Sequence, residues 1–102
     1  MKPRKAKAVK KILKKKGFVL NPNTGNHHEF YVLEIDGVKQ NVKTFFSHGK
    51  SEVSRVIMGK MKKQLKFTDS TKAEDFFDCP LTKEMYIQML RDEEVIPPGE
   101  AK

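Results

Sequence analysis

Cysteine and long apolar runs are scarce in this chain of 102 residues, and each scarcity excludes a class of protein. A single cysteine, Cys79, can form neither an internal disulfide nor a cysteine cluster for a metal, which favours a reducing cytoplasm. No apolar run approaches the ~18 residues of a membrane span, so no membrane partner is expected. Residues 1–16 lack the apolar core of a secretory signal. The length of the chain predicts one small domain with a single core.

Negative charge is also scarce, but only in the first two thirds of the chain. Residues 1–68 hold 17 basic and 4 acidic residues, a net charge of +13, whereas residues 69–102 hold 4 basic and 9 acidic residues, a net charge of −5. A strongly basic body indicates a polyanionic partner such as nucleic acid, because neutralised phosphates release counterions. The alternative is a solvated lysine surface that serves solubility alone.

Hydrophobic periodicity predicts the element order α-β-β-β-α for the basic body. Apolar residues at helical spacing predict helices over residues 5–16 and 51–65, and alternating segments predict strands over residues 18–20, 27–35 and 38–46. Gly17 ends the first helix, and Asp36-Gly37 is typical of a two-residue hairpin turn with positive φ at both positions. The second helix has an apolar stripe of Val53, Val56, Ile57, Met61 and Leu65.

The two-residue turn also predicts the register of the hairpin, with Ile35 opposite Val38 and Tyr31 opposite Val42. Side chains alternate between the faces of a sheet, so the two faces can be written down. The face expected in the core carries Tyr31, Leu33, Ile35, Val38, Val42 and Phe46. The other face carries His28, Phe30 and Val32 opposite Phe45, Lys43 and Asn41, with Glu34 beside Lys39.

Aromatic rings and cations share this second face. Proteins bind single-stranded RNA with such surfaces, because bases stack on the rings and ammonium groups hold the phosphates. The sequence therefore predicts an RNA-binding surface at Phe30, Lys39, Lys43 and Phe45. The alternative is a second hydrophobic layer that the C-terminal segment or a partner covers.

Four short motifs resemble one known family. They are Lys16-Gly17-Phe18-Val19-Leu20, Gly25-Asn26-His27-His28, the segment from Thr44 to His48-Gly49, and Lys62-Lys63-Gln64-Leu65. Over about residues 8–66 the chain resembles the HicA family of messenger-RNA interferase toxins. The resemblance implies an α+β fold like that of a double-stranded-RNA-binding domain, with two helices on one face of a three-stranded antiparallel sheet. It also implies RNA, single- or double-stranded, and an antitoxin protein as partners.

The resemblance further implies a catalytic histidine. The second histidine of the family's Gly-Ser-His-His-like turn is its functional residue and corresponds to His28, although Asn26 stands where serine is usual and the proline and arginine before His48 are absent. RNA carries its own 2′-OH nucleophile, and an imidazole can serve as the general acid or base near neutral pH. His48 and His27 are secondary candidates, with Lys39 and Lys43 as phosphate ligands.

No metal or other cofactor is expected. The adjacent His27 and His28 point apart on a strand, and no cysteine or acidic ligand follows at a suitable spacing.

The last third of the chain, residues 69–102, is an acidic extension without a counterpart in that resemblance. Thr71 and Glu74 form a capping-box pattern before a helix that contains Phe76 and Phe77 and ends near Cys79-Pro80. Thr82 caps a further helix over residues 83–92, whose apolar stripe holds Met85, Met89 and Leu90 beside Tyr86 and Ile87. These apolar side chains cover the predicted RNA surface, pack elsewhere on the body of residues 1–68, or form a homodimer contact.

Three functional hypotheses follow. The first is an RNA-binding protein that acts as a metal-independent ribonuclease through His28. The second is a nucleic-acid-binding module without catalysis, and the third is a protein-interaction domain of the toxin-antitoxin type.

Overall fold

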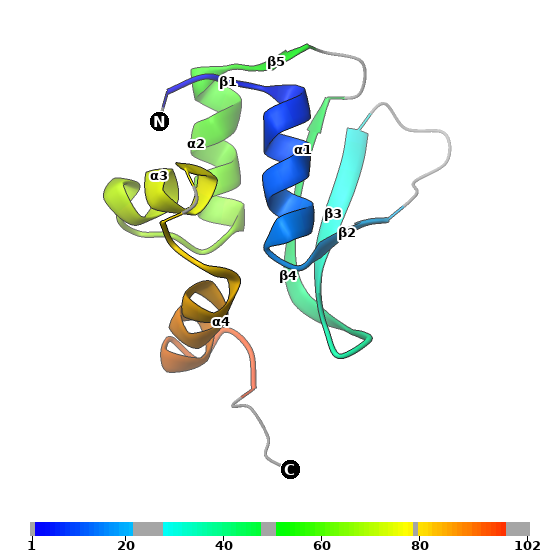
Figure 1. Ribbon diagram of the computed structural model, residues 1–102, viewed down its shortest axis with the longest axis vertical. Coiled ribbons are helices and arrows are strands. Elements are labelled where there is room, and N and C mark those ends of the chain that lie inside the picture. The colour runs from blue at the N-terminus through cyan, green and yellow to red at the C-terminus, as the bar shows by residue number, and fades with distance from the viewer. Residues whose placement is uncertain (1, 22–27, 48–50, 79, 98–102) are drawn as a thin grey trace.

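The computed structural model describes residues 2–21, 28–47, 51–78 and 80–97 (Figure 1). These residues form an α+β structure in which a three-stranded antiparallel sheet of order β2-β3-β4 carries helices on one side. The elements are β1 (Arg4–Lys5), α1 (Ala6–Lys15), β2 (Phe18–Asn21), β3 (His28–Ile35), β4 (Val38–Ser47), β5 (Glu52–Val53), α2 (Arg55–Gln64), α3 (Ser70–Asp78) and α4 (Lys83–Asp92).

The predicted α-β-β-β-α order is confirmed for α1, β2, β3, β4 and α2. Gly17 follows α1 with φ of 99°, a conformation that a side chain would strain, and so turns the chain into β2. Asp36 and Gly37 both have positive φ, 52° and 80°, as the hairpin turn between β3 and β4 requires.

A second sheet was not predicted. The strands β1 and β5 form a two-stranded antiparallel pair with Arg4 opposite Val53. The predicted helix over residues 51–65 therefore starts later, at Arg55, after Ser54 accepts a hydrogen bond from the backbone N–H of Ile57 at 3.3 Å. The prediction that Val53 and Val56 share one helical stripe is wrong, since Val53 is buried in β5 and Val56 is 67% exposed.

The register of the β3·β4 hairpin is only partly as predicted. Ile35 lies opposite Val38 as expected, but the register shifts between Val32 and Glu34, and Tyr31 then faces Thr44 rather than Val42. The shift inserts two residues into β4, and because two is the period of a strand, the remaining side chains keep their faces.

The covered face of the sheet contributes Tyr31, Leu33, Val42 and Thr44, all buried. The prediction that Val38 belongs to the core is wrong, since its side chain is 61% exposed beside the turn. Ile35 packs against the core as a partly buried residue, and the side chain of Phe46 lies outside the described part of the chain.

The two helices of the acidic extension pack into the same core as α1 and α2. An aromatic cluster links them to the body; its members are Phe18, Phe67, Phe76, Phe77 and Tyr86. The rings of Phe76 and Tyr86 meet edge to face with centroids 4.9 Å apart, a favoured geometry for aromatic pairs.

Both helices of the extension differ in detail from the prediction. The prediction of a capping box is wrong. Asp69 Oδ1 accepts from the backbone N–H of Thr71 at 2.8 Å, and Glu74 accepts from the backbone N–H of Lys2 instead. Thr82 does cap α4 as predicted, with Met85 as the donor at 3.1 Å. The buried side of α4 carries Tyr86, Ile87 and Leu90, so the predicted stripe of Met85, Met89 and Leu90 is rotated.

Within the described ranges, no helix has the length and apolar character needed to cross a membrane.

Candidate nucleic-acid interface

The face of the sheet opposite the helices carries two stacked aromatic rings, those of Phe30 on β3 and Phe45 on β4. The register shift makes these residues direct cross-strand partners, and their ring centroids lie 5.0 Å apart with an interplanar angle of 27°. Both are half-buried. Without the shift Phe30 would face Lys43, as the sequence predicted, so the paired rings are a product of the irregular strand.

Two exposed lysines of β4 lie on the same face, between these rings and the hairpin turn. Lys43 lies opposite Val32, one cross-strand pair along the face from the two rings. Lys39 lies opposite Glu34, close to the hairpin turn and farther from the rings. The structure therefore brings Phe30, Lys43 and Phe45 together on one face, while Lys39 stands at its far end beside a carboxylate.

Of the candidate histidines, only the backbone of His28 is described, and it lies at the end of the sheet away from the hairpin. The backbone of His28 forms the first position of β3 and pairs with Ser47, the last residue of β4. The side chain of His28, and the whole of His27 and His48, lie outside the described part of the chain.

The described helices of the acidic extension, α3 and α4, pack on the helical side of the sheet and not over Phe30 and Phe45. Phe76 and Tyr86 are fully buried in the core cluster with Phe18, which lies on the covered side of β2. Tyr86 donates its hydroxyl to the backbone oxygen of Leu65 at 2.9 Å, and burial raises the pKa of that phenol. The alternative in which the extension masks the aromatic face is therefore wrong, because its large apolar side chains complete the core.

A buried lysine also ties the extension to the body. Lys16 is only 2% exposed, and its ammonium donates to the backbone oxygen of Leu81 while lying 5.6 Å from the centre of the Phe76 ring. A buried charge is tolerated only when polar and aromatic groups replace its water. Lys16 is therefore a structural cation rather than part of a nucleic-acid surface.

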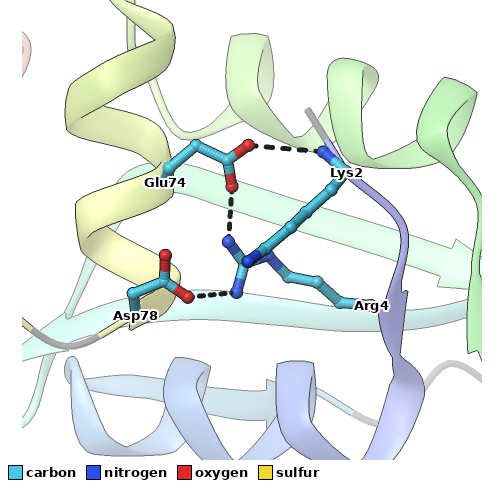
Figure 2. A network of polar contacts seen from close by, with 4 residues as sticks. All are labelled: Lys2, Arg4, Glu74 and Asp78. Carbon is cyan, nitrogen blue, oxygen red and sulfur yellow. Dashed lines mark hydrogen bonds and ion pairs between the residues drawn. The ribbon is translucent and has the colours of Figure 1, made fainter.

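Arg4 on β1 forms a clamp with the extension (Figure 2). Its guanidinium pairs with Glu74 and with Asp78, the latter at 2.7 Å, and lies 5.4 Å from the Phe77 ring centre. Glu74 also accepts from the backbone N–H of Lys2 at 3.3 Å. The clamp fixes the N-terminal strand against α3.

The clamp shifts the pKa of each of its charged groups. Burial lowers the pKa of Arg4, but its hydrogen bonds to Asp78 and Glu74 and the negative charges of these two carboxylates together outweigh burial and leave the pKa above its ordinary value. Burial raises the pKa of Glu74, but the hydrogen bonds from Arg4 and the Lys2 backbone, together with nearby positive charge, outweigh burial and lower the net pKa. The same guanidinium lowers the pKa of Asp78. All three groups are therefore held in their charged forms.

Two residues from the motifs that carry the HicA resemblance contact each other. The hydroxyl of buried Thr44 on β4 donates to Oε1 of Gln64 at 2.6 Å, and the backbone N–H of Phe45 donates to the same oxygen at 3.3 Å. Gln64 thus fixes the end of α2 against the strand that presents Phe45. Sequence reasoning missed this pair, although both residues stand in the quoted motifs.

In the described part of the chain, more exposed cations lie on the two helices of the body than on the three-stranded sheet. Helix α1 carries Lys7, Lys11, Lys14 and Lys15, and α2 carries Arg55, Lys60 and Lys63, all exposed. The aromatic face has Lys39 and Lys43. The positive potential that attracts a polyanion therefore has its largest source on the helices.

Comparison with known proteins gives no relative: no family model, no curated protein and no solved structure matches this chain.

Proposed function

We propose that this protein binds single-stranded RNA on the aromatic face of its sheet. The observation that carries the proposal is the half-buried pair of Phe30 and Phe45, which lies beside Lys43 on the side of the sheet away from the helices. Two adjacent rings offer a platform for bases, and base stacking tolerates any sequence. Lys43 supplies an ammonium for a phosphate within one cross-strand pair of the rings.

The order of elements supports a fold like that of a double-stranded-RNA-binding domain for residues 6–64. Both α1 and α2 lie on one face of the β2-β3-β4 sheet, which is the arrangement that the HicA resemblance implies. The link from Thr44 to Gln64 strengthens the resemblance, because it gives two motif residues a shared structural role.

The binding proposal is tested with a fluorescein-labelled single-stranded RNA whose anisotropy is measured over a salt series. The wild-type protein should bind at low salt, and the affinity should fall steeply as salt rises. Phe30→Leu keeps an apolar side chain but removes a stacking surface, and should weaken binding at least about fivefold, since stacking contributes ~1–3 kcal/mol per base. Leu20→Ala is the control, because it trims an exposed apolar side chain of similar size on β2.

Absence of RNA binding at low salt would overturn the proposal. Equal losses of RNA affinity for Phe30→Leu and Leu20→Ala would show that the rings do not contribute to binding. If the wild-type protein bound another protein through this face and bound no RNA, that result would favour the interaction-domain hypothesis.

Ribonuclease activity is a second candidate function, favoured by the position of His28. This residue starts the strand that carries Phe30 two positions later, so the histidine of the HicA-like motif lies at the end of the proposed RNA surface. A general acid or base there would deprotonate the 2′-OH or protonate the leaving 5′-oxygen. The proposed site of action is the cytoplasm, with an antitoxin protein as a further partner.

The activity is tested by incubating purified protein with labelled RNA in the presence of EDTA. His28→Ala should abolish cleavage while the circular dichroism spectrum stays unchanged. Continued cleavage by His28→Ala, in a preparation freed of contaminating nuclease, would remove His28 from the mechanism.

A further inference from the structure

A basic hollow lies beside the β1·β5 pair and the first turns of α1. Its volume is about 780 Å³, and it is lined by Lys5, Ala6, Lys7, Lys10, Ser51 and Glu52. Three ammonium groups and one carboxylate give this lining an excess of positive charge. The residues come from two parts of the chain more than forty positions apart, so the sequence alone does not bring them together.

The β1·β5 pair determines which basic side chain of β1 lines the hollow. Successive side chains of a strand point to opposite sides, and Arg4 points to α3, where Glu74 and Asp78 neutralise it. Lys5 therefore lies on the other side of β1, opposite Glu52 across the pair. Within the described part of the chain, Lys5 forms no ion pair with a carboxylate, nor does Lys7. The clamp on Arg4 thus holds the strand that positions Lys5.

The hollow and the histidine end of the sheet lie at the same end of the molecule. In Figure 1 the start of β3 and the end of β4 lie at the end where β1 and β5 pair and where α1 begins. His28 and Ser47 are the paired residues at that end of the sheet. An RNA strand that leaves the rings of Phe30 and Phe45 toward His28 and passes around that end of the sheet therefore reaches the end of the molecule where the basic hollow lies.

We propose that this basic hollow binds backbone phosphates of the RNA strand whose bases stack on Phe30 and Phe45. The inference rests on the RNA binding proposed above and adds a phosphate subsite to it. Lysine ammonium groups hold phosphates without reading bases, so the subsite positions the strand and does not select its sequence. Glu52 opposes the phosphate, and its charge limits the affinity of the hollow.

Two matched double variants of the full chain test the subsite. Lys5→Ala/Lys7→Ala removes two charges from the hollow, and Lys11→Ala/Lys14→Ala removes two exposed charges farther along the same helix. Anisotropy with single-stranded RNA at ~0.1 M salt should show about a tenfold loss for the first pair and less than threefold for the second. The slope of log affinity against log salt should fall by about 0.7 for each phosphate contact that is lost.

A single carboxamide substitution tests the same hollow in the opposite direction. Glu52→Gln removes the opposing carboxylate and should strengthen RNA binding about threefold, whereas Glu84→Gln, which removes an exposed carboxylate from α4, should leave it unchanged. Thermal unfolding of each variant checks that the protein is folded, and Glu52→Gln keeps the test valid if Lys5→Ala/Lys7→Ala does not fold.

The outcomes separate the two proposals. Suppose that the wild-type protein binds RNA. If the two double lysine variants then lose RNA affinity equally, or if Glu52→Gln binds RNA no more tightly than Glu84→Gln, the phosphate subsite is wrong and the proposed aromatic surface stands. If the wild-type protein does not bind RNA at low salt, both proposals fall.

Discussion

Aromatic rings gather at two places in this protein, one on each side of the sheet. On the helical side, Phe76 and Tyr86 are completely buried and meet rings from three different segments of the chain. On the opposite side, Phe30 and Phe45 contact each other, remain half-exposed, and lie beside Lys43. The first group holds the acidic extension to the basic body, whereas the second leaves ring surface for a ligand.

The surroundings of an aromatic pair, and not its residue type, decide what the pair does. Enclosed rings contribute to the free energy of unfolding because all of their area is removed from water. Rings on a partly open sheet contribute less to it and retain area that stacking with a base can bury. Substitutions in the first group should therefore act mainly on the free energy of unfolding, and substitutions in the second mainly on RNA affinity.

Removal of the acidic extension should have the largest effect. Deletion of residues 69–102 takes away Phe76, Phe77 and Tyr86 and exposes the rings of Phe18 and Phe67 that they cover. We expect the remaining chain to lose its cooperative thermal transition and its dispersed amide resonances. A folded and monomeric residue 1–68 fragment would contradict the conclusion that the extension completes the core.

Truncation of one buried ring should have the next largest effect on stability. Phe76→Ala should lower the free energy of unfolding by ~3–5 kcal/mol, because it leaves a cavity among rings that cannot all move to fill it. Urea denaturation followed by circular dichroism measures the loss. A change below ~1 kcal/mol would show that the cluster is loosely packed, and the contrast between the buried and the half-exposed rings would then be weaker.

The same substitution on the other side of the sheet should act on binding. Phe45→Ala should lower the affinity for single-stranded RNA by ~1–3 kcal/mol, the contribution of one stacked base. Its effect on the free energy of unfolding should be clearly smaller than that of Phe76→Ala, since Phe45 is half-exposed. Urea denaturation and RNA titration of both variants measure the two effects, and equal destabilisation would mean that Phe45 is a core residue.

The Arg4 clamp should give the smallest effect, and its size should depend on pH. Arg4→Gln should lower the free energy of unfolding by about 1 kcal/mol or less near pH 7, because Glu74 and Asp78 are partly exposed. Arg55→Gln, which alters an exposed arginine of α2, is the control.

The sign of the pH dependence follows from the two carboxylates. Their pKa values are lowered in the folded protein, so their contribution is present above the unfolded values near 4 and is lost as the pH falls through the folded values. The difference between wild type and Arg4→Gln should therefore shrink below about pH 4. A difference that stays constant down to pH 2 would show that Arg4 acts by packing on Phe77 rather than by charge.

Local signals in the sequence were sufficient for most elements of the fold. Gly17 ends a helix and Asp36-Gly37 closes a hairpin because their positive φ values are set by the residues themselves. The apolar period of residues 5–16 predicted α1 because its buried side repeats at the helical spacing. Such features depend on neighbours in the chain, and a sequence displays them directly.

The pairing of distant segments could not be predicted in the same way. The strands β1 and β5 are two residues each, too short for a period to show, and they form because Arg4 is held by α3 and Val53 enters the core. The register shift in β4 also escaped prediction, since the turn sets only the pairs next to it. That shift made Phe30 and Phe45 partners.

By itself, the sequence determined the division of charge, the order of the elements and the face on which Phe30, Lys43 and Phe45 lie. Only the tertiary structure decided that Phe76 and Tyr86 complete the core and that Lys5 shares a hollow with Ser51. The physical reason is that periodicity shows that a side chain must be buried but not what buries it. The residues that bury a side chain are determined by contacts between segments far apart in the chain, because several apolar faces can pack into the same core.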